Sequence, residues 1–252
     1  MRVRLFSVGV LSGALMATAC SSSDSAPSTN DLTRSLLAQP IGDGISTSVT
    51  IYGSSEDNGP RVTIAQVGFN LGTAEAPVKV LELSDYGCGF CRKFHQETFP
   101  TLLTEFIETG MVEWKFVPYI TGMWESSVAA TEAAECTYIQ DEAAFEALNA
   151  RLWADQPEWK RSDDTEAVVR GWVSESGIDM DAFDACLAEN EIMQRVADAT
   201  LLARQIGVRG TPTFVVIGFP PIQGALPLET FREILSTVHA QATSEGEGEG
   251  EN

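Results

Sequence analysis

Two cysteines separated by two residues, Cys88 and Cys91, stand between a nearly continuous apolar run and a segment with helical periodicity. The run APVKVLELS, residues 76–84, contains β-branched residues and is typical of a strand that is buried on both faces. From residue 91 to residue 109, apolar side chains recur at helical spacing until Gly110 ends the pattern. The pair is therefore expected at the point where a strand of a sheet turns into a helix.

Four kinds of site use a cysteine pair with this spacing, and the neighbouring residues separate them. A haem attachment site needs histidine directly after the second cysteine, where this sequence has Arg92. A structural zinc site needs about four ligands, and the sequence has neither a second CxxC motif nor HxxxH. A metal-binding, copper-handling module that uses Cys88, Cys91 and His95 stays open as the alternative. A structural disulfide across two residues closes a small ring and adds little stability, which favours redox chemistry.

The position of the pair at the start of a helix assigns a role to each thiol. Unsatisfied N–H groups and the positive end of the helix dipole stabilise a thiolate, so Cys88 is expected to be the nucleophile. Cys91 lies one turn further in and is expected to be buried, protonated and ready to resolve a mixed disulfide. Glu82, in the strand just before, is a candidate acceptor for the Cys91 proton. The alternative for Glu82 is an edge position that faces solvent.

The wider pattern resembles a known family. VLELSDYGCGFC followed far downstream by GVRGTPTF is similar to the Dsb-type (DsbA/DsbC-like) thiol–disulfide oxidoreductases of the thioredoxin superfamily, over residues 76–238. The resemblance implies an α/β thioredoxin fold, with a central mixed β-sheet flanked by helices and an inserted helical domain. It also implies that Glu82 is the family's buried acid. It further implies that Pro212 is cis and lies against the active-site disulfide, where Thr211 before it pairs with an extended substrate.

The residues around the motif depart from the family pattern. Gly89 and Phe90 separate the cysteines and are expected to meet substrate, whereas the strongly oxidising members carry Pro-His there. Glycine followed by an aromatic residue, and threonine before the proline, are closer to the isomerase branch. Members of that branch also have an N-terminal dimerisation domain, and residues 21–72 are short and polar for one. The resemblance therefore implies an oxidoreductase that needs no bound cofactor, with the direction of net electron flow left open.

The rest of the chain is expected to form one thioredoxin-like domain, residues 73–242. The segment MVEWKFVPYI predicts a second strand, TFVVIG a later strand, and LETFREILSTVHA a final amphipathic helix. Residues 123–206 are helical in pattern and form the insertion. Within it, Gly171 and Gly177 are stop signals, and Asp179 is expected to cap a late helix. A parallel βαβ unit followed by a β-hairpin and a helix gives a sheet covered on both faces.

The N-terminus has the plan of an export signal. Two arginines precede an apolar run and a stretch of small residues, which predicts a signal peptide over residues 1–19. The residues before Cys20 resemble a bacterial lipobox, which predicts a lipid on Cys20; the alternative is ordinary cleavage near Ala19. Residues 20–72 are then a lipidated N-terminus and polar linker with room for short strands. The protein is thus expected in the cell envelope or periplasm, with its lipid anchored in a membrane.

The net charge of the chain excludes some classes of binding partner. The sequence has 36 acidic and 16 basic side chains and a net charge of −20, which repels nucleic acid and anionic lipid headgroups. The expected partners are cysteine-containing exported proteins and a membrane or periplasmic redox partner. Residues 243–252, which are rich in glutamate and glycine, are expected to form a disordered acidic tail.

The five cysteines need an explanation, because an odd number in an exported protein leaves one unpaired. If Cys20 carries lipid, four remain: Cys88 with Cys91 as the redox disulfide, and Cys136 with Cys186 as a structural disulfide. The structural bridge would close a loop of about 50 residues and stabilise the fold by about 4 kcal/mol in the chain-entropy model. The alternative is that its two cysteines are buried free thiols.

Overall fold

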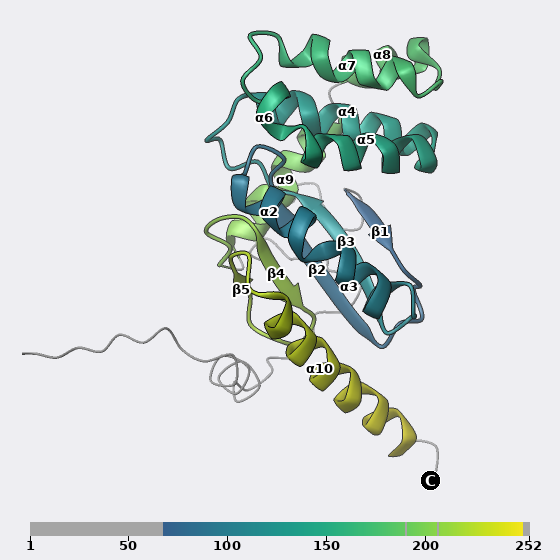
Figure 1. Ribbon diagram of the computed structural model, residues 1–252, viewed down its shortest axis with the longest axis vertical. Coiled ribbons are helices and arrows are strands. Elements are labelled where there is room, and N and C mark those ends of the chain that lie inside the picture. Colours follow the sequence, from purple (N-terminus) through teal and green to yellow (C-terminus); the bar gives the residue numbers. More distant parts are fainter. Residues whose placement is uncertain (1–67, 190, 206, 249–252) are drawn as a thin grey trace, which may run out of the picture.

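The computed structural model describes residues 68–189, 191–205 and 207–248 (Figure 1). The predicted signal peptide, the lipid site at Cys20 and most of the polar linker lie outside these residues. Among the described residues, no helix is both long enough and apolar enough to cross a membrane.

A five-stranded mixed sheet forms the centre of the described chain, in the order β1-β3-β2-β4-β5. The strands are β1 (Phe69–Leu71), β2 (Val78–Ser84), β3 (Val112–Pro118), β4 (Thr213–Val216) and β5 (Ile222–Gln223). β2 and β3 are parallel, and the other neighbouring strands are antiparallel. From β2 onward, the order of elements is the predicted one, a parallel βαβ unit followed by a β-hairpin and a last helix. The predicted domain start at residue 73 is too late, because β1 comes before it and pairs with β3 at the edge of the sheet.

The two faces of the sheet bury different helices, because successive side chains of a strand point to opposite sides. Val78 and Val80 of β2 pack in one core cluster, which includes Phe94. Leu81 and Leu83 pack in the other cluster, together with the helical insertion. The first face carries α2 (Gly89–Glu97), α3 (Phe99–Leu102), the π-helical turn η2 (Leu103–Ile107) and α10 (Leu228–Gly248). Both faces of β2 are thus buried, as its continuous apolar sequence predicts.

The helical run that follows the cysteines is divided into three pieces. α2 ends at Glu97 and α3 begins at Phe99, with Pro100 in the first turn of α3. Proline has no N–H group to donate, and the first turn of a helix needs none. Gly110, with φ 76°, ends the run in the left-handed conformation that glycine adopts readily.

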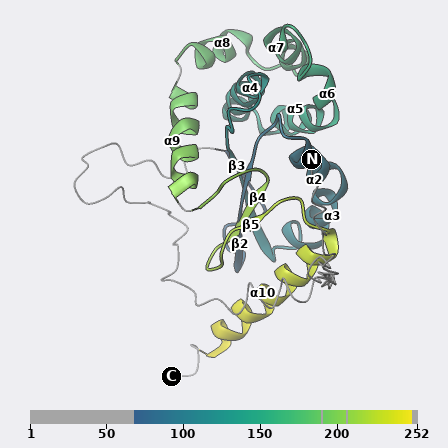
Figure 2. The ribbon, with the colours of Figure 1, turned by 90° about the vertical axis from the view of Figure 1, so that its left-hand side faces the viewer.

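The helical insertion between β3 and β4 packs against one end of the sheet (Figure 1). Its helices are α4 (Ser126–Gln140), α5 (Glu142–Ala154), α6 (Gln156–Trp159), α7 (Thr165–Glu175), α8 (Met180–Glu189) and α9 (Glu191–Gln205). Figure 2 shows α9 running from the insertion back alongside the sheet. The hydroxyl of Thr200 in α9 accepts a hydrogen bond from the backbone N–H of Ile120 at 3.3 Å, just after β3. The insertion is therefore tied to the sheet at the end where β3 stops.

Of the three helix start and stop signals predicted inside the insertion, the structure confirms two. Asp179 caps α8 as predicted, since its side chain accepts hydrogen bonds from the backbone N–H groups of the second and third residues after it. Gly177 follows α7 with φ 83°, as a stop signal should. The stop predicted at Gly171 is wrong, because Gly171 lies inside α7. Burial of Trp172 and Val173 beside it outweighs a helix penalty of about 1 kcal/mol for glycine.

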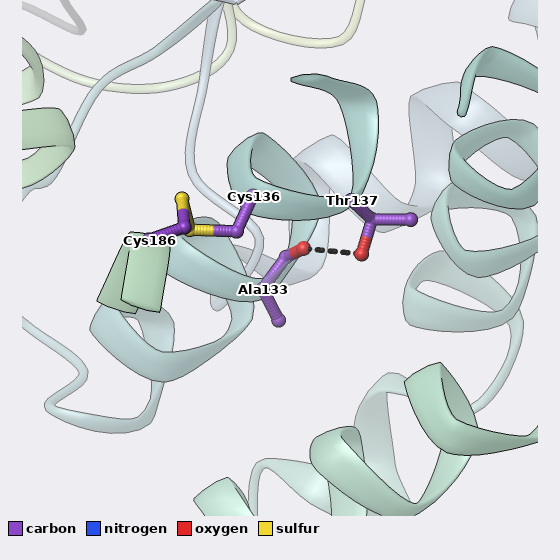
Figure 3. Close-up of a disulfide and its surroundings, with 4 residues drawn as sticks. All are labelled: Ala133, Cys136, Thr137 and Cys186. Carbon is purple, nitrogen blue, oxygen red and sulfur yellow. Dashed lines mark hydrogen bonds between the residues drawn. A yellow bond between two sulfur atoms is a disulfide. The ribbon is translucent and has the colours of Figure 1, made fainter. Parts of the chain in front are cut away.

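A disulfide between Cys136 of α4 and Cys186 of α8 ties the insertion together (Figure 3). The two Cα atoms are 5.9 Å apart, although 50 residues separate them in the sequence. One residue further along α4, the hydroxyl of Thr137 donates to the carbonyl oxygen of Ala133 at 2.7 Å (Figure 3). The alternative of two free buried thiols is therefore not what the structure shows.

The start of the acidic tail differs from the prediction. α10 continues through Gly248, so residues 243–248 are helical and not disordered. Val238 still belongs to the core, whereas the next turn, residues 241–244, is mostly exposed. The helix continues without core packing because each added residue extends an existing helix by one hydrogen bond and needs no new nucleation.

Candidate active site

Cys88 and Cys91 lie where β2 gives way to α2, as predicted. Cys88 is the N-cap residue of α2, and its carbonyl oxygen accepts a hydrogen bond from the backbone N–H of Arg92 at 3.0 Å. Both cysteines are free, so the structure shows the dithiol form of the pair and not the disulfide form. Cys91 is fully buried, and Cys88 is 3% exposed. The pair is thus enclosed on all sides except where the Cys88 sulfur meets a groove.

The surroundings of the two thiols push their pKa values apart. The pKa of Cys88 is lowered to about 6, chiefly by a hydrogen bond from Cys91, and further by Thr211 and the backbone N–H groups at the start of α2; burial opposes this. Burial raises the pKa of Cys91 well above its ordinary value, and the neighbouring Cys88 adds to the effect. At neutral pH, a thiolate at Cys88 therefore faces a protonated thiol at Cys91, which suits a nucleophile and its resolving partner.

Glu82 is fully buried in β2, on the face of the sheet that α2 covers. Its Oε2 accepts a hydrogen bond from Trp114 Nε1 at 2.9 Å. Its Oε1 accepts a hydrogen bond from the Ser84 hydroxyl and lies 2.7 Å from His95 Nε2. Because a buried carboxylate needs such partners, these three side chains hold Glu82 in place. The alternative in which Glu82 faces solvent is wrong.

His95 belongs to this buried cluster. Its ring stacks on Trp153, with the centroids 4.3 Å apart and the planes at 7°, while Nε2 faces Glu82. Within the described residues, no group of three His, Cys, Asp or Glu side chains is arranged to hold a metal ion. The geometry therefore gives no support to the alternative metal site made of Cys88, Cys91 and His95.

A groove of about 790 Å³ opens beside the Cys88 sulfur. In the turn before β4, Thr211 and Pro212 are joined by a cis peptide bond. The Cys88 thiol donates a hydrogen bond to the carbonyl oxygen of Thr211 at 3.4 Å. Gly89 and Phe90 line the same groove, and Phe90 is 68% exposed. The structure thus brings the segment between the cysteines and the Thr-Pro turn to one surface.

The remaining lining of the groove comes from residues to which the sequence analysis gave no role in the site. Val208, Arg209 and Gly210 belong to the GVRGTPTF segment that carries the family resemblance, and Tyr119 lies near the end of the segment predicted as the second strand. The others lie in the loop after β3 and in α9: Thr121, Met123, Trp124 and Arg204. Lys93 of α2 completes the lining. No local pattern marks them, because only the folded chain brings them together.

The helical insertion holds the loop that carries Cys88, which the sequence analysis also missed. Gln156 of α6 donates hydrogen bonds from Nε2 to the carbonyl oxygens of Tyr86 and Cys88, at 2.6 and 2.9 Å. Lys160, just after α6, donates to the carbonyl oxygen of Gly87. These two side chains satisfy the carbonyl groups of three successive residues and so fix the start of α2.

Comparison with known proteins agrees with this geometry. A family model described as Thioredoxin matches residues 65–237, more than half of the chain. The chain belongs to the thioredoxin family. The predicted thioredoxin fold, with its mixed sheet flanked by helices, is therefore confirmed.

The relatives of this chain indicate which type of thioredoxin-family protein it is. Probable disulfide bond formation protein D of Bacillus anthracis is 28% identical over 171 residues, which are 67% of this chain and 78% of that protein. The crystal structure of oxidised BdbD from Bacillus subtilis shares the fold with a TM-score of 0.61, at 23% identity over 69% of this chain and 93% of that one. Alpha-DsbA1 from Wolbachia pipientis has a TM-score of 0.63, at 19% identity over 70% and 92% of the two chains. The chain is a thiol–disulfide oxidoreductase of the Dsb type.

Proposed function

We propose that this oxidoreductase forms disulfide bonds in exported proteins. In this proposal, Cys88 exchanges with substrate, Cys91 resolves, and the groove beside Thr211 and Pro212 binds the substrate. The observation that supports this proposal most directly is the different exposure of the two sulfurs. The Cys88 sulfur lies 3.4 Å from the Thr211 carbonyl oxygen and borders an open groove, while Cys91 is fully buried. Of the two sulfurs, only that of Cys88 is in position to meet a substrate sulfur.

The reaction steps follow from these positions. In the oxidised protein, a substrate thiolate attacks the Cys88 sulfur; a mixed disulfide forms, and Cys91 leaves as a thiolate that takes up a proton. A second substrate thiolate attacks the substrate sulfur of the mixed disulfide, and Cys88 leaves as a thiolate. The substrate loses two electrons and the protein gains them. A membrane or periplasmic redox partner then accepts both electrons and restores the disulfide.

Two observations favour this direction of electron flow. A thiol with a low pKa is a good leaving group and stabilises the reduced protein, and the pKa of Cys88 is about 6. The Bacillus anthracis relative also bears the name of a disulfide bond formation protein. Both support net electron flow from substrate to the Cys88–Cys91 pair.

The groove suits an unfolded substrate segment. Phe90 and Met123 are large apolar side chains that are 68% and 73% exposed, and both line the groove. Exposed apolar side chains that gather at one site mark an interaction surface. They would cover apolar side chains of an extended segment whose backbone pairs with Thr211, as in β-augmentation.

The proposal includes export and anchoring, for which residues 1–19 are the signal peptide and Cys20 is the lipid site. Export places the protein in a compartment where disulfides form and persist. Mass spectrometry of the mature protein from a Gram-negative host should find a lipid-modified Cys20 as the first residue. An unmodified N-terminus at any residue would contradict the anchor.

The activity is tested by refolding a reduced, denatured disulfide protein with the oxidised enzyme. One equivalent of enzyme should yield one equivalent of substrate disulfide and leave the Cys88–Cys91 pair reduced. Cys88→Ser should transfer nothing, and Cys91→Ser, preloaded at Cys88 with a mixed disulfide, should no longer resolve it. The proposal is wrong if the wild-type protein transfers no oxidising equivalents or if Cys88→Ser transfers them as well.

A further inference from the structure

Behind the resolving thiol, Ser84 is a neighbour of Cys91, and hydrogen bonds connect Ser84, Glu82 and His95. We propose that Ser84 and His95 complete a proton relay that connects Cys91, through Glu82, to a second cavity separate from the substrate groove. The inference rests on the proposed role of Cys91 as the resolving thiol. It adds two relay residues, Ser84 and His95, to the acid that the sequence predicts.

The first link joins Cys91 to Ser84. Both residues are fully buried, so bulk water has no direct access to the Cys91 sulfur. Burial raises the pKa of Cys91, and a hydrogen bond with the Ser84 side chain acts in the opposite direction. A hydroxyl both donates and accepts hydrogen bonds, so Ser84 can receive a proton from one neighbour and pass its own to the next.

The second link joins Ser84 to Glu82 and His95. The Ser84 hydroxyl donates to Glu82 Oε1, and the same oxygen lies 2.7 Å from His95 Nε2. Trp114 occupies the other carboxylate oxygen at 2.9 Å and has no proton to exchange at neutral pH. Proton movement at Glu82 is therefore directed between Ser84 on one side and His95 on the other.

The third link connects His95 to a cavity through which protons can enter and leave. His95 borders a cavity of about 600 Å³ that shares no lining residue with the substrate groove. Trp153 stacks on the imidazole and fixes the plane of the ring. Gln96 and the carboxylates Glu108 and Glu146 line the same cavity and supply polar groups that can hydrogen-bond to solvent there. Protons can then enter and leave while substrate covers the groove at Cys88.

The relay is balanced in both halves of the cycle. When Cys91 leaves as a thiolate, it takes the hydroxyl proton of Ser84. Glu82 receives the Nε2 proton of His95 and passes it to Ser84, and the imidazole takes up a proton at Nδ1 from solvent in the cavity. When the redox partner restores the disulfide, the Cys91 proton departs along the same line in reverse. No electrons move along the relay, and the reverse transfer returns the imidazole to its starting tautomer.

The test measures how fast Cys91 resolves a mixed disulfide between Cys88 and glutathione, in a single turnover and across pH 5 to 9. Ser84→Ala and His95→Gln should each slow the release of glutathione by about 100-fold at pH 6, the scale of general acid–base catalysis. The wild-type rate should change little with pH. Both variants should gain rate steadily as pH rises, since hydroxide replaces the missing acceptor.

Two matched controls separate the relay from packing. Thr131→Val removes another buried hydroxyl, one without a hydrogen-bond partner among the described residues. His239→Gln removes the other histidine of the sequence, which lies on α10. Both controls should keep the wild-type rate and its flat pH profile. Cys88 beside Cys91, Tyr86 near Glu82, and Glu108 and Glu146 in the cavity are the charged and titratable neighbours of the relay, and they are unchanged in every variant.

A rescue experiment excludes a purely structural effect. His95→Ala opens space beside Glu82, and added imidazole should restore the rate, whereas it should not speed Ser84→Ala. Ser84→Thr retains the hydroxyl and should stay within a few-fold of the wild-type rate. The relay is wrong if Ser84→Ala and His95→Gln resolve the mixed disulfide as fast as the wild-type protein. The proposed function itself is wrong if the wild-type protein fails to resolve it.

Discussion

The Cys88 sulfur donates a hydrogen bond to the carbonyl oxygen of Thr211 at 3.4 Å, although 123 residues separate the two in the sequence. The contact joins the start of α2 to the turn before β4 and forms one wall of the substrate groove. While Cys88 is protonated, the thiol therefore occupies the same carbonyl group that we propose an extended substrate would use. Ionisation of the thiol, or formation of the mixed disulfide, removes this proton and frees the acceptor.

Alkylation of the reduced protein should report the low pKa of Cys88. The rate of reaction with iodoacetamide should rise with pH around a midpoint of about 6, because the hydrogen bond from Cys91 stabilises the thiolate. Cys91→Ala removes that hydrogen bond, the largest cause, and should move the midpoint upward. A wild-type midpoint near the value of about 8.5 for a free thiol would contradict the assignment.

Lys160, which lies outside the CxxC motif, should also help to lower the pKa of Cys88. Its ammonium group donates to the carbonyl oxygen of Gly87 and lies 4.2 Å from the ring centre of Trp124. Burial lowers the pKa of Lys160, and the charge of Cys88 opposes this, so the two groups attract each other. Lys160→Met should therefore raise the alkylation midpoint, by roughly half a pH unit to one unit for a partly screened charge.

Arg161→Met is the matched control for Lys160, because it removes the next basic side chain, which bonds only within its own segment. It should leave the midpoint where the wild-type protein has it. An unchanged midpoint in Lys160→Met would show that this lysine only anchors the loop and has no electrostatic effect on the thiolate.

The sequence predicted the features that depend on local pattern. The continuous apolar run of β2, the position of Cys88 at a helix start and the cap at Asp179 all act within a few residues, so they can be recognised without a fold. Gln156 could not be predicted, since its partner carbonyl at Tyr86 is 70 residues away. His95 was left open as a metal ligand in the alternative, because the sequence places it near Cys91 but does not show that Glu82 is beside it.

At residues 243–248 and at Gly171, a prediction from local composition was wrong. Composition predicted a disordered tail and a helix stop, yet helix propagation and the packing of neighbouring residues decide the outcome at both places. Propensity is a weak influence of about 1 kcal/mol or less per residue, so tertiary contacts override it wherever they are larger.

The disulfide between Cys136 and Cys186 should stabilise the protein without taking part in catalysis. It closes a segment of 50 residues between α4 and α8, so its removal frees a long loop in the unfolded chain. The double variant Cys136→Ala/Cys186→Ala should lose about 4 kcal/mol of unfolding free energy in the chain-entropy model. Guanidinium denaturation measures the loss, and single-turnover exchange at Cys88 in the folded variant should match the wild-type rate.

Glu135 should make the stability of the protein depend on pH. This residue of α4 is 9% exposed, and its carboxylate accepts a hydrogen bond from the backbone N–H of Gly68 at 3.0 Å. Burial raises its pKa to about 7, although Gly68, Lys115 and Arg195 act in the opposite direction. Between about pH 4.5 and 7, the native state then binds more protons at this site than the unfolded chain does.

Linkage gives the sign and the size of the effect. Because the native state binds the extra proton, unfolding free energy is greatest below the unfolded pKa and falls as pH rises toward 7, by up to about 3 kcal/mol in total. Glu135→Gln cannot ionise, so its free energy of unfolding in urea should change less between pH 5 and pH 8. Glu189→Gln, which changes an exposed carboxylate on α8, should keep the wild-type decline. Equal declines in all three proteins would show that Glu135 ionises in the native state as readily as in the unfolded chain.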